Sequence, residues 1–245
     1  MRVDKMIGNA NLDTRRNIKR NAKKGALVIN GDIVKDTSTQ VDPNVDEVFY
    51  MGEFVEYFEN IYIMMNKPQG YISSTYDVDP TVVDILDDFY KTLDLSIAGR
   101  LDKDTRGLLI LSTDGNFIHK ITSPNSNIEK TYEVETRDLI DESLVEEFLQ
   151  GVYIAEDNYQ ARPAKLKIID DKKAIVKVTE GKFHLVKRLF SNLGNEVVEL
   201  KRIAIGELRL DPFLNEGDYR ELNEKELALF TNWLNEGKEV ICIKI

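Results

Sequence analysis

The chain has 245 residues, of which 42% are hydrophobic and 31% charged, enough to bury the core of one or two globular domains. It contains no apolar run of the roughly 18 residues that a membrane span needs, and no apolar segment typical of a secretory signal at its start. A single cysteine and two histidines exclude an internal disulfide and offer no metal-ligand cluster. We therefore expect a cytoplasmic protein without a metal site.

The charge is distributed unevenly along the chain. The net charge is −10, yet residues 1–24 hold eight basic and two acidic residues, so this segment carries +6 and the remainder −16. A basic end on an acidic body indicates a surface for an anionic partner such as RNA. On charge alone, a solvated helix face explains the same pattern equally well.

Two short helices are predicted at the start of the chain. An apolar spacing of three and four residues begins at Val3 and predicts the first helix. Asp13 or Thr14 can cap a second helix, which Gly25 can end, with Ile18 on its inner face. Six basic side chains remain on the outside of this helix, namely Arg15, Arg16, Lys19, Arg20, Lys23 and Lys24.

A small sheet is predicted next. Two apolar runs within residues 26–34 flank Asn30-Gly31, a pair that tolerates positive φ and favours a tight hairpin. Residues 46–51 predict a further strand. The acidic segment 53–60 is poor in glycine and proline, so we expect a connection of limited reach.

The second half of the chain opens on an apolar strand at 61–65 that runs into a turn at 66–70. Residues 81–89 have the spacing of an amphipathic helix. The apolar run at 108–111 ends at a turn and predicts a strand that is buried on both faces.

The loop at 99–107, just before that strand, concentrates charge between two glycines. Its charged residues are Arg100, Asp102, Lys103, Asp104 and Arg106. Loops fixed between apolar segments often carry functional residues. A lone Asp in a loop usually forms a turn or a cap, whereas two neighbouring carboxylates also suit a metal or an acid and base pair. The flanking cations compete with a metal.

The remaining elements complete an α+β pattern. We expect helices at 117–121 and 139–149, strands at 129–134, 152–159, 164–169, 174–178, 197–203 and 208–210, and a last helix from Asn223. Asn223 and Glu226 can form its capping box, with Leu227, Phe230 and Leu234 facing inward.

Three motifs resemble those of the RNA pseudouridine synthases, in particular their RsuA/RluB-like branch. They are Gly-Arg-Leu-Asp-x-Asp-Thr-x-Gly-Leu-Leu at 99–109, Glu-Lys-x-Tyr-x-Val at 129–134 and Glu-Gly-Lys-Phe-His-Leu-Val-Lys-Arg-Leu at 180–189. The resemblance implies that residues 61–236 form a pseudouridine synthase domain, with a mixed, mainly antiparallel sheet flanked by helices.

The resemblance also implies a role for the matched side chains. Asp102 corresponds to the family's catalytic carboxylate, Tyr132 lies against the target base, and Lys187 is the basic partner of Asp102. The chain departs from the family at Leu185, where glutamine is common. Further contacts with the substrate RNA are expected from Lys67, Arg100, His184 and Arg188, of which His184 positions or packs rather than acting as a base.

Residues 1–58 resemble the S4 RNA-binding domain, because two helices precede a small sheet and the segment 27–34 is typical of that domain. In an S4 domain the basic helix follows the RNA phosphates. The resemblance therefore implies that Arg15, Arg16, Lys19 and Arg20 bind RNA. Residues 237–245 form a tail without an assigned role.

The resemblance implies an enzyme that converts a specific uridine of ribosomal RNA, in the small subunit (16S), to pseudouridine. Asp102 is then the catalytic carboxylate, and the target base is flipped out of its stack. The reaction is an isomerisation, so no cofactor is expected. The expected partner is ribosomal RNA or the assembling small ribosomal subunit, bound by a monomer and without a membrane.

Three other interpretations remain open. A pseudouridine synthase of the same layout can act on large-subunit (23S) RNA. A non-catalytic RNA-binding factor for ribosome assembly would be expected to lose Asp102, Tyr132 or Lys187, and all three are present. A glycosidase-like hydrolase would need carboxylates on opposite faces of the sugar, which Asp102 and Asp104 on one loop do not favour.

Overall fold

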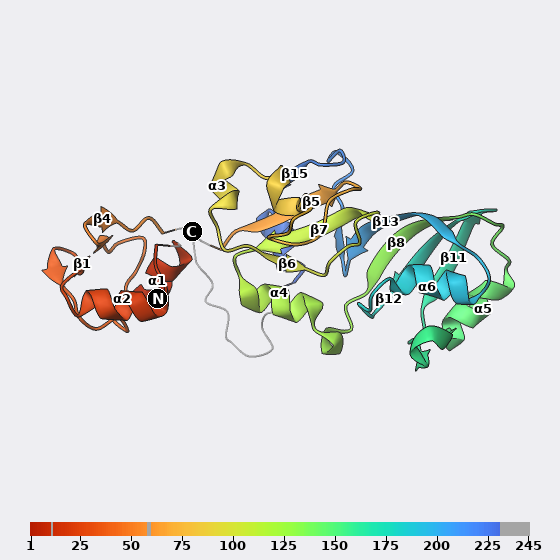
Figure 1. Cartoon of the computed structure of the whole chain (residues 1–245), viewed down its shortest axis with the longest axis horizontal. Coiled ribbons are helices and arrows are strands. Elements are labelled where there is room, and N and C mark those ends of the chain that lie inside the picture. The colour runs from red at the N-terminus through yellow and green to blue at the C-terminus, as the bar shows by residue number, and fades with distance from the viewer. Residues whose placement is uncertain (11, 58–59, 231–245) are drawn as a thin grey trace. The chain divides into compact units, whose positions relative to one another are not determined.

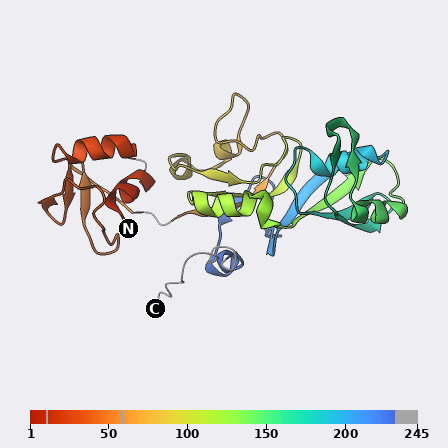
Figure 2. The same ribbon diagram turned by 90° about the horizontal axis from the view of Figure 1, so that it is seen from below.

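The computed structural model of the chain describes residues 1–10, 12–57 and 60–230. The chain divides into two compact units, residues 1–61 with 87–95, and residues 62–86 with 96–245. Both units contain helices and mostly antiparallel sheet, which confirms the predicted α+β class (Figures 1 and 2). Within the described ranges, no helix is long and apolar enough to cross a membrane.

The first unit combines short helices with a four-stranded antiparallel sheet of order β2-β1-β3-β4. Its elements are α1 (Val3–Asn9), α2 (Arg15–Ala22), β1 (Leu27–Ile29), β2 (Asp32–Ile33), β3 (Val48–Tyr50), β4 (Glu53–Phe54) and α3 (Asp88–Lys91). Val3 and Ile18, predicted to face inward, are fully buried in its hydrophobic core.

Single residues set the boundaries of these elements. Thr14 caps α2 by accepting a hydrogen bond from the main-chain N–H three residues later. Asn30 and Gly31 have φ angles of 50° and 87°, which confirms the tight hairpin between β1 and β2. The sequence predicts a plain connection at 53–60, but residues 53–54 form the short strand β4, which pairs with β3. Phe54 of β4 packs edge-on against Phe49 of β3.

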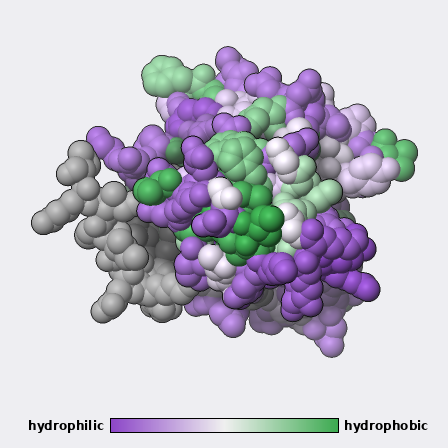
Figure 3. Space-filling view, turned by 90° about the vertical axis from the view of Figure 1, so that its left-hand side faces the viewer, coloured by the Kyte–Doolittle hydropathy of each residue, from purple (hydrophilic) through white to green (hydrophobic). Residues whose placement is uncertain are grey.

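Exposed hydrophobic side chains of the first unit include Ile33, Val45, Met51 and Phe54. On the face of the molecule that Figure 3 shows, hydrophilic residues predominate and hydrophobic ones form small groups between them. Such a surface is ordinary for a folded protein, so the exposed hydrophobic residues by themselves indicate no binding site.

The second unit is built on a nine-stranded sheet with the main order β11-β12-β8-β13-β7-β5-β15, to which β14 and β6 are added at β13 and β7. These strands are β5 (Tyr62–Lys67), β6 (Ser96–Ala98), β7 (Arg106–Ser112), β8 (Lys130–Thr136), β11 (Lys165–Asp170), β12 (Lys173–Val178), β13 (Val197–Ile205), β14 (Leu208–Arg209) and β15 (Tyr219–Glu221). Among the described strands, β13 and β7 alone pair in parallel, so the sheet is mixed and mainly antiparallel, as predicted.

Helices and short turns complete this unit. They are α4 (Gly115–Thr122), α5 (Ser143–Gln150), α6 (Leu185–Asn192) and α7 (Glu224–Ala228), with 3₁₀ turns at Val82–Ile85, Pro124–Ser126 and Ala155–Asp157 and a separate hairpin of β9 (Tyr153–Ile154) and β10 (Tyr159–Gln160). In Figure 1, α5 and α6 lie along the half of the sheet that contains β11, and α4 lies along β6 and β7. One hydrophobic core contains Phe148 and Phe190, and a second contains Phe117.

Several predicted elements differ in extent from the observed ones. Residues 81–89 do not form one amphipathic helix, because Leu86 has an extended backbone (ψ 157°) between the turn Val82–Ile85 and α3. The helix predicted at 139–149 begins only at Ser143. The strand predicted at 152–159 is split into β9 and β10 by a turn that ends at Asn158, with φ 50°.

The last described element begins as predicted. Asn223 and Glu226 form the capping box of α7. Phe230 is buried and Leu227 is half-buried, in agreement with their predicted inward positions. The predicted inward position of Leu234 lies outside the described residues.

The parallel pairing of β7 with β13 depends on a glycine. Gly107 has φ 102°, and a Cβ at this position would lie 2.2 Å from the main-chain oxygen of Arg202. Glycine permits both the left-handed backbone and this close approach of two strands. As a result, the side chain of Arg202 lies next to the loop that precedes β7.

Candidate active site

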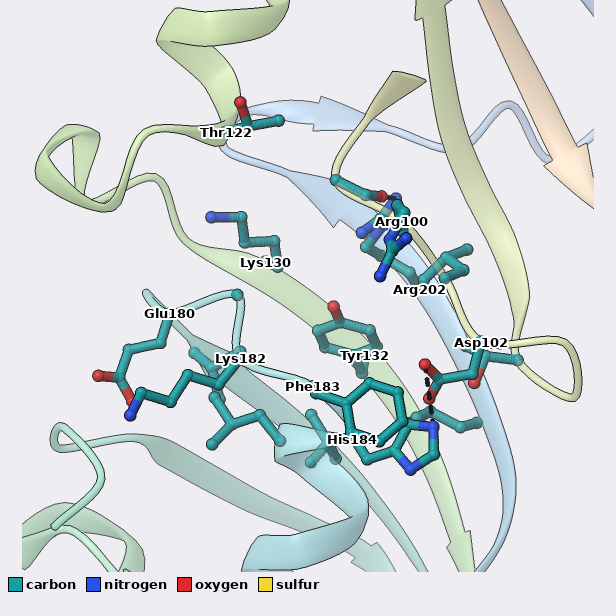
Figure 4. A pocket seen from close by; sticks show the side chains of 18 of the residues that line it. Arg100, Asp102, Thr122, Lys130, Tyr132, Glu180, Lys182, Phe183, His184 and Arg202 are labelled. Atoms are coloured by element: carbon teal, nitrogen blue, oxygen red, sulfur yellow. Dashed lines mark hydrogen bonds and ion pairs between the residues drawn. The ribbon is translucent and has the colours of Figure 1, made fainter. Parts of the chain in front are cut away.

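A cavity of about 440 Å³ in the second unit brings the three motifs together. Its walls come from the loop at 99–105, from β8 and β13, from the end of α4, and from the segment 178–186 that leads into α6. Figure 4 shows Asp102, Tyr132 and His184 converging on this space, each from a different motif. Residues that lie far apart in the sequence therefore form one site.

Asp102 contacts two basic side chains from the third motif. Its Oδ1 lies 3.3 Å from Nε2 of His184, and its Oδ2 lies 3.6 Å from Nζ of Lys187. The Asp102 side chain is 25% exposed. A carboxylate that is fixed by neighbours and still accessible can act as a nucleophile or as a general base.

Lys187 bridges two carboxylates. Its Nζ lies 2.5 Å from Oδ1 of Asp104, so the predicted contact with Asp102 is present but is the longer of the two. Burial tends to raise the pKa of Asp104, but the hydrogen bond and charge of Lys187 outweigh it and leave that pKa lowered. Among the described residues, no group of three or more His, Cys, Asp and Glu side chains could hold a metal ion.

Lys67 supports the Asp102 loop from inside the protein. The side chain is fully buried. Its Nζ donates hydrogen bonds to the main-chain carbonyl oxygens of Pro68 (3.0 Å), Asp102 (3.0 Å), Lys103 (3.4 Å) and Thr105 (2.9 Å). Burial lowers its pKa to about 8. The predicted contact of Lys67 with RNA does not fit this position, because the ammonium group is enclosed by protein carbonyl groups.

Two further side chains fix the same loop. The hydroxyl of Ser73 donates to the carbonyl oxygen of Leu101 (2.7 Å) and accepts from its N–H (3.0 Å). The buried guanidinium of Arg202 donates to the carbonyl oxygens of Gly99 and Leu108, both at 2.8 Å. The main chain on either side of Asp102 is therefore held by residues of other segments.

Tyr132 and Arg100 provide the other predicted contacts within the cavity. Tyr132 lies on β8 between Val176 of β12 and Arg202 of β13, and its half-buried ring borders the cavity (Figure 4). Arg100 is exposed and lines the cavity from the Asp102 loop. An aromatic ring and a cation beside a carboxylate are suited to a nucleotide, whose base stacks and whose phosphates are anionic.

His184 has a backbone conformation that is uncommon for a residue with a side chain. Its φ is 51°, directly before α6. Such left-handed residues often occur at functional sites. The His184 ring stacks on that of Phe183, with the centroids 3.6 Å apart, and Phe183 is 67% exposed. This arrangement directs Nε2 of His184 to Asp102 and leaves an aromatic surface accessible at the site.

Arg188 lies apart from the cavity lining. Its Nη1 is 2.7 Å from Oδ2 of Asp157, its Nε is 3.5 Å from Glu156, and its side chain is only 14% exposed. The predicted contact of Arg188 with RNA does not fit this position, because the guanidinium is paired with the turn that joins β9 and β10.

The basic residues predicted to bind RNA in the first unit lie on the surface of α2. Arg15, Arg16, Lys19 and Arg20 are exposed, and Ile18 on the opposite face is fully buried. Within the described part of the chain, none of the four has an acidic side chain within ion-pairing distance. Their charges are therefore available to an external anion.

Some side chains that line the cavity are not among the site residues predicted from the sequence, namely Lys130, Lys182, Phe183 and Arg202. The first three lie inside the matched motifs, so the motifs themselves could have pointed to them. No local signal marked Arg202, because only the pairing of β13 with β7 brings it to the Asp102 loop.

Comparisons with known proteins agree with this geometry. The RNA pseudouridylate synthase family matches residues 61–199, which include all three motifs. An uncharacterized RNA pseudouridine synthase of Bacillus subtilis, YtzG, is 44% identical over 94% of this chain and 98% of its own length. The ribosomal small subunit pseudouridine synthases A of Haemophilus influenzae and Escherichia coli K12 are 40% and 37% identical, over 93% of this chain and 98% and 99% of their own.

A solved structure leads to the same family. The crystal structure of a pseudouridylate synthase with 40% sequence identity superposes with a TM-score of 0.67, covering 93% of this chain and 98% of that chain. Sequence and three-dimensional similarity thus extend over nearly the whole chain. The chain therefore belongs to the RNA pseudouridine synthase family, and within it to the RsuA-like branch.

Proposed function

We propose that this protein converts one uridine of small-subunit ribosomal RNA to pseudouridine, with Asp102 as its catalytic carboxylate. The observation that carries the proposal is the position of Asp102, on a loop fixed from several sides and facing a cavity beside Tyr132. The choice of the small subunit is supported by the small-subunit enzymes of H. influenzae and E. coli, which match over nearly their full length.

The reaction moves the ribose from one atom of uracil to another. The bond between C1′ and N1 breaks, and a bond between C1′ and C5 of the same uracil forms. Asp102 supplies the carboxylate at the ribose, either as a nucleophile or as a base. His184 and Lys187, at 3.3 Å and 3.6 Å, hold this carboxylate in place.

The detached uracil has to remain in the cavity until it is rejoined to the ribose. A cavity of about 440 Å³ lies in the range typical of sites for small molecules. Tyr132 offers a flat surface for the base. Arg100, exposed next to the Asp102 loop, fills the space that the flipped base leaves or holds a phosphate; the flip itself costs a few kcal/mol.

We also propose that residues 1–58 act as an S4-like RNA-binding domain and that the catalytic domain covers 61–236, followed by a tail at 237–245. Residues 231–236 and the predicted tail lie outside the described residues. The exposed cations of α2 support RNA binding, since Lys and Arg bind phosphates and release counterions. The partner is then ribosomal RNA or the assembling small subunit, which would be met in the cytoplasm and bound by a monomer.

Mapping of pseudouridines in ribosomal RNA tests this function. Cells that lack the gene should lose one pseudouridine of small-subunit RNA, and wild-type protein should restore it whereas Asp102→Asn should not. Asp79→Asn is a matched control, because Asp79 pairs with the exposed Lys103 of the same loop and lies outside the cavity lining. Loss of a pseudouridine from large-subunit RNA would contradict the proposed substrate. An unchanged set of pseudouridines in ribosomal RNA would contradict the proposed function.

A further inference from the structure

Lys130 is a buried cation in the cavity wall, and among the described residues no carboxylate pairs with it. The residue is 8% exposed, and it lines the cavity shown in Figure 4. Burial and, to a smaller extent, the positive charge of Arg202 lower its pKa to about 8. Among the residues that the structure describes, no carboxylate or other acceptor is bonded to its ammonium group.

Comparison with Lys67 shows how unusual this position is. Both lysines are buried and both have a pKa of about 8. Lys67, however, donates to protein carbonyl oxygens, and its charge is further compensated by Asp102 and Asp104. A buried cation without such partners costs free energy. A side chain of this kind that borders a cavity is therefore suited to an acceptor atom of a ligand.

The position of Lys130 on β8 indicates which part of a nucleotide it meets. Lys130 and Tyr132 are two residues apart, so both side chains lie on the same face of the strand, about 6.6 Å apart along it. In Figure 4, Lys130 and Asp102 lie on opposite sides of Tyr132. A uracil against Tyr132 with its N1 toward Asp102 thus presents a carbonyl edge to Lys130.

A phosphate is the other anionic part of the substrate, but it fits this position less well. Each phosphate continues into the RNA chain on both sides, so it has to stay near the opening of the cavity. The base is the one part of a nucleotide at which the covalent structure ends, and it can be buried completely. The 8% exposure of Lys130 therefore favours the base.

We propose that the ammonium group of Lys130 binds a carbonyl oxygen of the target uracil and stabilises the negative charge of that base while it is detached from the ribose. The proposal rests on the pseudouridine synthase function proposed above and adds a catalytic residue to it.

The charge on uracil follows from the electron balance of the reaction. When the C1′–N1 bond breaks, its electron pair stays on N1, and the negative charge is shared with the carbonyl oxygens of the ring. Lys130 keeps its proton and pairs with this charge. When C5 bonds to C1′, the electron pair is used in the new bond. The proton on C5 is then released to solvent, and N1 takes up a proton from solvent, so that the rejoined uracil is neutral. This balance holds whether Asp102 acts as a nucleophile or as a base.

Single-turnover kinetics of Lys130→Met test the proposal. The rate of tritium release from RNA labelled at C5 of uridine should fall about 100-fold or more, as it does when one donor to a developing anion is removed. RNA affinity, measured by filter binding, should stay within about threefold of wild type, because the charge arises only after bond cleavage. Lys130→Arg should retain more activity than Lys130→Met, and ethylammonium ions should partly restore Lys130→Ala.

Lys201→Met is the matched control, because Lys201 lies on β13 of the same sheet but does not line the cavity. An unchanged rate for Lys130→Met would overturn the proposal, as would a loss of affinity with an unchanged rate, which would indicate a phosphate contact. Circular dichroism shows whether Lys130→Met is folded. If it is not, the proposal is tested by the activity of Lys130→Arg and by the rescue of Lys130→Ala with ethylammonium ions, and the absence of both would overturn it. If wild-type enzyme itself forms no pseudouridine in ribosomal RNA, the proposed function has failed and not this assignment.

Discussion

The Nζ atom of Lys67 lies 3.0 Å from the main-chain carbonyl oxygen of Asp102 and contacts neighbouring carbonyl groups of the same loop. The lysine of the Asn-Lys-Pro turn thus sets the path of the loop that carries the proposed catalytic carboxylate. Because the ammonium group is enclosed, its effect on catalysis has to pass through the backbone of that loop.

Lys67→Met should lower both thermal stability and turnover. Each buried carbonyl group that loses its donor costs about 1–3 kcal/mol, and the Asp102 loop loses its internal support. Thermal unfolding and tritium release measure the two effects, with Lys91→Met as a control, because Lys91 forms an ion pair with an exposed carboxylate on α3. A variant with full stability and weakened RNA binding would instead restore Lys67 as an RNA contact.

Lys187→Met should reduce turnover at least tenfold, a loss of about 1.4 kcal/mol in transition-state stabilisation. Asp104→Asn should have a smaller effect, because it leaves Lys187 free to approach Asp102. The double variant, Lys187→Met with Asp104→Asn, distinguishes the effect of Lys187 on Asp102 from its effect on Asp104. If Lys187 acts only through Asp104, then Lys187→Met and Asp104→Asn will lower the rate equally and the double variant will be no worse.

Replacement of Arg15, Arg16 and Lys19 by Ala should weaken RNA binding and flatten its salt dependence. The log–log slope should change by roughly 0.7–0.9 for each phosphate that is no longer neutralised, with little change in the maximal rate, because these residues lie in the other unit. Filter binding across a salt series measures the slope. A triple variant of Lys165, Lys167 and Lys173 is the charge-matched control; an equal effect from both triple variants would refute a specific role of α2.

Gly107→Ala should destabilise the second unit by about 2–5 kcal/mol, since the new Cβ meets the backbone of Arg202 at 2.2 Å and the left-handed φ is strained as well. Gly70→Ala isolates the second effect, because Gly70 has φ 88° with no neighbouring atom within 4 Å, and should cost about 1–2 kcal/mol. Urea unfolding compares them. Equal losses of stability in Gly107→Ala and Gly70→Ala would contradict this prediction, because they would show that β7 and β13 move apart at little cost.

Lys130→Met should make the free protein more stable at pH 7, although it is expected to slow the reaction. The pKa of Lys130 falls from 10.5 to about 8 on folding, so the folded state bears the full cost of the buried charge below pH 8, about 3 kcal/mol. Between pH 8 and 10.5 the folded state loses this proton first, and the wild type recovers that stability. The advantage of Lys130→Met in urea unfolding should therefore shrink as the pH rises; a less stable variant at pH 7 would contradict this account.

Features that depend on residues close together in the chain could be predicted from the amino-acid sequence. The hairpin at Asn30-Gly31 follows from two residues that tolerate positive φ, and the caps of α2 and α7 follow from side chains within three positions. The buried strand β7 follows from an apolar run. The motifs around Asp102 and Tyr132 pointed to the family because they are continuous strings of residues, which need no knowledge of the fold.

The partner of each charged side chain, by contrast, could be identified only in the folded chain. The types and sequence positions of Lys67 and Arg188 favour RNA contacts. In the folded chain, however, Lys67 donates to backbone carbonyl groups and Arg188 pairs with Asp157. Arg202 reaches the site because β13 pairs with β7. Among the described residues, the packing of the chain places no counter-charge beside Lys130. The free energy of a charge depends on its burial and on neighbours from distant segments, and these are set by the path of the chain in space.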